Sequence, residues 1–346
     1  MSDLLPSAHV LGRATLALAP VLTFLLALVF FDTFRLVRPR RILWAVVVGA
    51  GCGLVTFIVN SSIMSLLRWE VFTFAIFIAP VVEEAIKALY LWWLIRTGRA
   101  GFMIDAAILG FATGAGFALA ENLYYLDVLP DAPLLVWFIR GFGTAVMHGG
   151  ATAIFAILMR SIGDQRRPGS PGVWLPGLVL AIVFHSAFNR FMIWPVPTTI
   201  VLLVVLPAAL VLVFRAGEKR LRYWLGVGFD RDTELLALIR EGEVSQTPLG
   251  RYLLSLRGSF RPDTVADMLC LLRLQAELSI RAKGLLVMKE HGLQPGKDPE
   301  IAEKLAEVRW LERSVGRTGL LALRPVCRWR DANRWQRHLL ESEEPD

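Results

Sequence analysis

Two adjacent carboxylates, Glu83 and Glu84, occur near the middle of an apolar stretch, residues 71–95, that is long enough to cross a bilayer. A charged side chain at the centre of a membrane helix costs about 2.5–3.5 kcal/mol on insertion scales. Lys87 lies one helical turn after the pair and can neutralise only one of the two carboxylates. The diglutamate therefore predicts a functional site rather than a structural ion pair alone.

Two histidines are expected at a similar depth in other apolar stretches. His148 interrupts residues 134–159, and His185 interrupts residues 173–194. With a rise of about 1.5 Å per residue, both fall within a few ångströms of the level of Glu83. A single intramembrane histidine is often a hydrogen-bonded packing residue, but two histidines at the level of a diglutamate favour a shared site.

Further polar residues follow these groups at helical spacing. A third glutamate, Glu121, lies towards the outer end of an apolar stretch, residues 104–122, which also carries many small residues suited to close helix packing. Residues four apart share one face of a helix and can form a supported polar pair. The pairs of this kind are Glu83 with Lys87, His148 with Thr152, and His185 with Asn189.

The elements that must position these groups are membrane helices. Hydrophobic residues make up 55% of the 346-residue chain and charged residues only 19%, which is too apolar for an ordinary soluble domain. We therefore expect an all-α polytopic bundle of about seven spans. The expected spans are residues 14–34, 42–60, 71–95, 104–122, 134–159, 173–194 and 198–214. The first span is expected to stay in the mature protein, because its apolar run is too long for a signal peptide.

Basic residues follow every second span, which predicts the orientation. They occur after the first, third, fifth and seventh spans, whereas the alternate connections contain few of them. The positive-inside rule then places the N-terminus outside and the C-terminus in the cytosol.

The composition changes after residue 215. Charges of both signs are dispersed among apolar residues at helical spacing, so we expect residues 1–215 to form the transmembrane bundle and residues 216–346 a cytosolic helical domain. The tail is nearly balanced in charge and has no basic stripe with interleaved aromatic residues, so no nucleic-acid partner is expected. Cys52, Cys270 and Cys327 suggest no disulfide framework, and the sequence assigns no oligomeric state.

Four short segments, in order along the chain, resemble the PrsW family of intramembrane proteases, which is itself similar to the CAAX-prenyl-protease superfamily. They are EEAIK from Glu83, FALAEN from Phe117, HGGAT from His148 and HSAFN from His185. The resemblance covers roughly residues 40–215. It implies hydrolysis of a membrane-anchored protein within the bilayer. We expect this membrane to be the cytoplasmic membrane of a bacterium.

The resemblance also implies roles for individual residues. Glu83 is expected to activate water as a general base, and Glu84 to contribute to positioning through Lys87. His or Asn groups are expected to stabilise the oxyanion without a metal. The expected catalytic residues are Glu83, Glu84, Glu121, His148, His185 and Asn189, supported by Lys87, Asn122 and Thr152. The wider superfamily has Phe-x-x-x-His where this chain has Phe117 and Glu121. The role of His148 therefore stays open. It is either the partner of the general base, or it takes no part because His185 and Asn189 form the oxyanion site alone.

Three other hypotheses remain open from the sequence. The first is a zinc-dependent protease with the metal held by ligands among Glu83, Glu121, His148 and His185, although the chain lacks the HExxH motif. The second is a proton-coupled transporter that relays protons through the same residues, although no internal repeat is seen. The third is a non-catalytic membrane scaffold.

Overall fold

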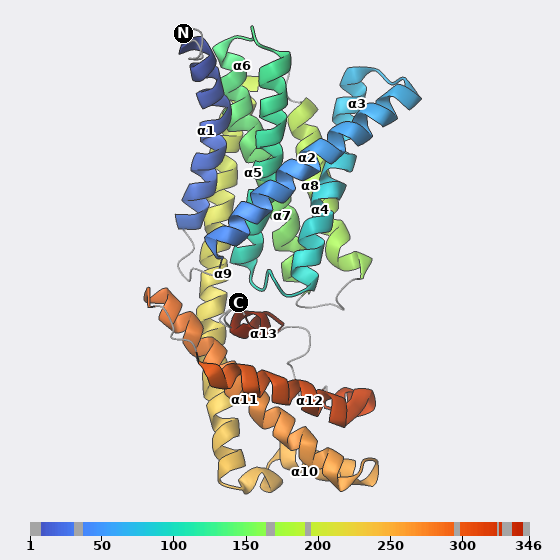
Figure 1. Cartoon of the computed structure of the whole chain (residues 1–346), viewed down its shortest axis with the longest axis vertical. Coiled ribbons are helices and arrows are strands. Elements are labelled where there is room, and N and C mark those ends of the chain that lie inside the picture. The colour runs from blue at the N-terminus through green and yellow to red at the C-terminus, as the bar shows by residue number, and fades with distance from the viewer. Residues whose placement is uncertain are drawn as a thin grey trace. The chain divides into compact units, whose positions relative to one another are not determined.

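A computed structural model describes residues 8–30, 37–163, 170–190, 195–293, 298–323, 325–326 and 334–341. Every regular element within these ranges is a helix, which confirms the predicted all-α class. The chain divides into two compact units, Met1–Gly217 and Glu218–Asp346 (Figure 1). Their relative placement is not determined, so each unit is described by itself.

The first unit is the polytopic bundle. Its helices are α1 (Ala8–Phe30), α2 (Pro39–Leu67), α3 (Val71–Phe77), α4 (Ala79–Arg96), α5 (Met103–Val128), α6 (Leu134–Phe138), η1 (Ile139–Thr144), α7 (Ala145–Gly163), α8 (Pro171–Arg190) and the first part of α9 (Pro195–Arg240). Six regions of the described chain are long and apolar enough to cross a membrane. They are Val10–Phe30, Pro39–Leu67, Met103–Val128, Leu134–Gly163, Pro171–Arg190 and Pro195–Tyr223.

The remaining predicted span, residues 71–95, is divided into two helices. α3 ends at Phe77 and α4 begins at Ala79, with Pro80 in its first turn. Proline has no backbone N–H to continue the preceding helix, so a break at this point is expected from its chemistry. The charges that mark the site, Glu83, Glu84 and Lys87, all lie in α4.

α5 lies at the centre of the bundle and is buried over most of its length. Its glycines allow two neighbours to approach closely. A Cβ at Gly114 would overlap the backbone carbonyl of His148 in α7, and a Cβ at Gly116 would overlap the carbonyl of Val46 in α2. This close packing brings the backbone of α5 against the helix that carries His148.

A π-helical segment, η1, precedes α7. It spans Ile139–Thr144 and contains Arg140 and two glycines, of which Gly141 packs against the backbone of α1 at Leu16. π-helical turns are rare, occur mostly as single turns inside α-helices and are frequent at functional sites.

The second unit is a small helical domain. It contains the remainder of α9, the short segments η3 (Glu243–Gln246) and η4 (Leu256–Gly258), and the helices α10 (Pro248–Ser255), α11 (Pro262–Glu290), α12 (Pro299–Ala322) and α13 (Arg334–Glu341). Its apolar core lies between α11 and α12, with Met268, Leu271 and Leu305 fully buried. Asp298 caps α12, and the buried Lys283 pairs with Asp232 at 2.5 Å. The cytosolic location of this unit stays a prediction.

Candidate active site

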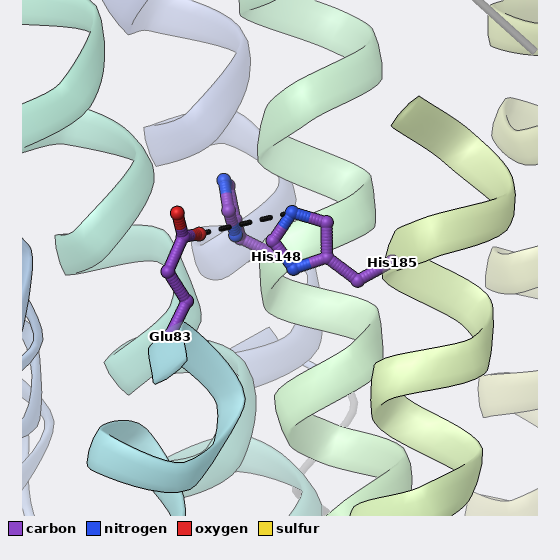
Figure 2. Close-up of side chains that lie close together, drawn as sticks. All are labelled: Glu83, His148 and His185. Atoms are coloured by element: carbon purple, nitrogen blue, oxygen red, sulfur yellow. Dashed lines mark ion pairs between the residues drawn. The ribbon is translucent and has the colours of Figure 1, made fainter. Parts of the chain in front are cut away.

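Glutamate and histidine side chains from four helices of the bundle meet in one cluster. Glu83, Glu84 and Lys87 come from α4, Glu121 from α5, His148 from α7 and His185 from α8. Figure 2 shows Glu83, His148 and His185 pointing towards one another from their separate helices. Residues separated by as many as 102 positions thus share one small volume.

Glu84 is the buried anchor of the cluster. Its Oε1 atom lies 2.6 Å from Lys87 Nζ and 2.8 Å from His185 Nδ1, and its side chain is 1% exposed. Lys87 therefore pairs with Glu84 and not with Glu83, the residue four positions earlier that the helical spacing had suggested. Adjacent helical positions point about 100° apart, which turns Glu83 towards a different side of α4.

His148 lies between Lys87 and Glu121. Its Nδ1 atom is 3.2 Å from Lys87 Nζ, and its Nε2 atom is 3.0 Å from Glu121 Oε2. An ammonium group can only donate hydrogen bonds, so Nδ1 accepts and Nε2 carries the proton that is donated to Glu121. The ring of Phe117 packs on both His148 and Lys87, with centroid distances of 4.6 Å to each.

Glu83 has a different environment from the other two glutamates. Its Oε2 atom lies 3.7 Å from His185 Nε2, and its Oε1 atom accepts a hydrogen bond of 3.3 Å from the amide of Asn60 in α2. Lys87 balances the charge of Glu84, and Arg140 lies 3.2 Å from Glu121. Within the described chain, the Glu83 carboxylate has His185 as its only ionic partner. A proton or an added cation would compensate this charge.

The same residues have the donor types of a metal site. Ligand atoms of Glu83, His148 and His185 lie within 4.8 Å of one another. One carboxylate and two imidazoles form the ligand set of many catalytic zinc sites, which keep a fourth position open for water. Carboxylates also hold the outer nitrogens of metal-binding histidines, as Glu84 and Glu121 do for these two rings.

Two observations bear on how His148 would bind a metal. Both of its ring nitrogens already have partners, so ligation would replace the contact with Lys87 or with Glu121. Glu121, which the sequence offered as a fourth ligand, lies outside the group of three and contacts His148 instead. With that difference, the residues present fit a divalent cation.

The amides and the hydroxyl that were predicted to belong to the site make other contacts. Asn189 donates a hydrogen bond to the carbonyl of Ala75 in α3, at 2.8 Å. Asn122 donates to the carbonyl of Ala17 in α1, and Thr152 donates to the backbone carbonyl of His148 rather than to its ring. The two asparagines thus join neighbouring helices around the cluster, whereas the Thr152 bond lies within α7.

Two residues of the cluster were missed from the sequence. Arg140 belongs to none of the motifs found in the sequence, yet it lies within the apolar helical region 134–163 and contacts Glu121. The cost of an intramembrane charge was the signal that could have identified it. The expected second span ends at Asn60, but α2 continues to Leu67 and places Asn60 beside Glu83.

The family model described as "PrsW family intramembrane metalloprotease" matches residues 38–214, about half of the chain. The chain belongs to the PrsW family. No curated protein and no solved structure matches the chain. Membership confirms the resemblance read from the four motifs, and the matched region contains every residue of the cluster. The protein is therefore an integral membrane protein and an intramembrane peptidase, which implies membrane-protein substrates. A proton-coupled transporter is not favoured.

Proposed function

We propose that this PrsW-family protein hydrolyses a peptide bond of a membrane-anchored substrate at the cluster of Glu83, His148 and His185. The observation that carries the proposal is the convergence of these side chains from α4, α7 and α8. Among the described residues, the Glu83 carboxylate has no lysine or arginine partner, and its one ionic contact is with His185. A carboxylate of this kind is energetically costly in a membrane bundle, and this cost favours a functional role for Glu83.

A metal-dependent reaction is the form that the donor set supports best. Glu83, His148 and His185 would hold the ion, which would supply Lewis-acid polarisation and an activated water. Glu84 and Glu121 fix the two imidazole rings through hydrogen bonds, and Asn60 holds the Glu83 carboxylate. Lys87 balances the charge of Glu84 within the buried side of the cluster.

The metal-free form remains the second candidate, because Lys87 and Glu121 occupy both nitrogens of His148. In that form, Glu83 takes a proton from the attacking water, since it is the carboxylate that no described lysine or arginine neutralises. His185, whose Nε2 atom faces Glu83, would then stabilise the oxyanion. Glu84 positions His185 in either form, and Lys87 positions His148 in the metal-free form.

The test of the proposed activity is cleavage in liposomes. Purified protein is reconstituted with a panel of fluorescently tagged single-span proteins, and cleaved fragments are identified by mass spectrometry. Glu83→Gln and His185→Ala are each expected to lower cleavage by at least about 100-fold, in line with the loss of a general base or a metal ligand. The assignment is wrong if both variants cleave as the wild type does.

Metal analysis separates the two forms of the reaction. The metal-dependent form predicts about one bound zinc or similar ion per chain, loss of activity in chelator and recovery on adding zinc. It also predicts loss of the bound ion in His185→Ala. Full activity after exhaustive chelation, with no ion found by elemental analysis, would instead assign the metal-free form.

A further inference from the structure

Arg140 is the one cation of the cluster that belongs to none of the four sequence motifs. It lies in the π-helical segment η1, two turns before His148 in the chain, and crosses to α5. Its Nη2 atom lies 3.2 Å from Glu121 Oε1, and its guanidinium lies over the ring of Tyr125 at 3.7 Å from the centroid. Its side chain is 11% exposed. A largely enclosed arginine in an apolar helical region requires a functional or structural reason.

The Glu121 carboxylate is divided between two partners. Oε1 faces Arg140, and Oε2 faces the Nε2 atom of His148 at 3.0 Å. Glu121 is the most exposed of the three glutamates, with 29% of its side chain accessible, compared with 16% for Glu83. Without the guanidinium, the bond to His148 would be the one contact among the described residues that holds this carboxylate in place.

The orientation of His148 depends on that carboxylate. Lys87 occupies Nδ1 as a donor, so the ring proton must lie on Nε2 and point at Glu121. If Glu121 turned away, the Nε2–H group would lose its acceptor, and the ring would be free to rotate or change tautomer. An outer partner that fixes a histidine in this way is commonly worth about 10–100-fold in metal affinity or activity.

We propose that Arg140 is a positioning residue for the reaction, which acts by holding Glu121 so that Glu121 fixes the tautomer and orientation of His148. This inference rests on the proposed function for its effect on catalysis, but its effect on His148 stands apart from any activity. The π-helical turn supplies the geometry, since it places Arg140 and His148 on one chain segment while both reach the same carboxylate from α5.

The direct test is the state of the His148 ring. The full-length protein is labelled with ¹⁵N-histidine and reconstituted, and the His148 signals are assigned by their absence in His148→Gln. The wild type is expected to show a single neutral Nε2–H tautomer. Arg140→Gln is expected to broaden or shift both ring nitrogen signals, and Arg140→Lys to restore most of the wild-type pattern. Unchanged His148 signals in Arg140→Gln would overturn the proposal.

The catalytic consequence is tested with the same variants on a cleaved substrate. Arg140→Gln is expected to lower kcat by about 10–100-fold with little change in KM, because its role is to position His148. The double variant Arg140→Gln/Glu121→Gln should lose no more activity than Glu121→Gln alone, since the two residues act in series. Multiplied losses in the double variant would show that Arg140 acts independently of Glu121, contrary to the proposal.

Arg68→Gln is the matched control, because it removes one guanidinium from the exposed end of α2. It should leave both kcat and the His148 signals unchanged. If the wild type cleaves no substrate while the His148 signals still depend on Arg140, the proposed function fails and the positioning role survives. If the wild type cleaves and the His148 signals do not depend on Arg140, the proposed function survives and the positioning role fails.

Discussion

Glu83 and Glu84 are neighbours in the sequence but differ in charge balance and exposure. Glu84 contacts a lysine and a histidine and is almost fully buried. Glu83 contacts an asparagine and the second nitrogen of the same histidine, and 16% of its side chain is exposed. The difference follows from the roughly 100° rotation between consecutive helical positions. It suggests a structural and positioning role for Glu84 and a reactive role for Glu83.

Paired substitutions at the two glutamates test this division. Glu84→Gln leaves the buried ammonium of Lys87 without its counter-ion, so we expect the free energy of unfolding to fall by about 3–5 kcal/mol. Glu83→Gln removes a carboxylate that no described lysine or arginine neutralises, so we expect no loss of stability but loss of cleavage. Denaturant unfolding in detergent micelles and the liposome assay measure the two effects. Equal destabilisation by both variants would contradict the division of roles.

At the scale of helices, the site depends on how closely α5 packs against α7. Gly114 has no space for a side chain, because a Cβ would overlap the carbonyl of His148 itself. Gly51 in α2 has no atom within 4 Å of the position that a Cβ would take. The two glycines therefore form a natural comparison within one bundle.

We expect Gly114→Ala to lower the free energy of unfolding by about 1–3 kcal/mol, because the two backbones must separate. It should also reduce cleavage, since the displaced segment of α7 carries His148. Gly51→Ala is expected to be neutral or slightly stabilising, because alanine favours the helix more than glycine does. Thermal unfolding and cleavage of both variants check this prediction, and equal behaviour of the two would argue against the close contact.

The sequence predicted the membrane helices and the meeting of Glu83, Glu84, His148 and His185 better than it predicted their contacts. The free-energy cost of an intramembrane charge and the helical period of the sequence identify charged groups at a common depth. They do not determine which side chain of a neighbouring helix each group contacts. Lys87 thus binds Glu84 instead of Glu83, and Asn189 binds α3 instead of the cluster. The π-helical turn that carries Arg140 has no sequence periodicity of its own, so the partner of Glu121 could not be predicted.

The whole molecule combines an apolar bundle with a charged helical unit. Most of the spans that the composition predicted are present, and the third is divided at Ile78 where Pro80 interrupts the hydrogen bonding. The second unit has its own apolar core, and no described residue of it belongs to the cluster. We propose that it lies in the cytosol, as the basic loops of the bundle predict.

Cysteine labelling tests this orientation. Cys270 in α11 is free and exposed, whereas Cys52 lies within the membrane helix α2. A membrane-impermeant maleimide is expected to label Cys270 in inside-out vesicles and not in intact cells. The double variant Cys270→Ser/Cys327→Ser is the control and should remain unlabelled. Labelling of Cys270 in intact cells would reverse the predicted topology.

The unequal exposure of the glutamates also has a chemical consequence. Reagents that modify carboxyl groups, such as a lipid-soluble carbodiimide, should reach Glu83 well before the shielded Glu84. Glu83 is the partly exposed member of the group of three, so an adduct on it would obstruct the group. Protection of this residue by a bound peptide would then report occupancy directly, even for substrates that are held but never cut.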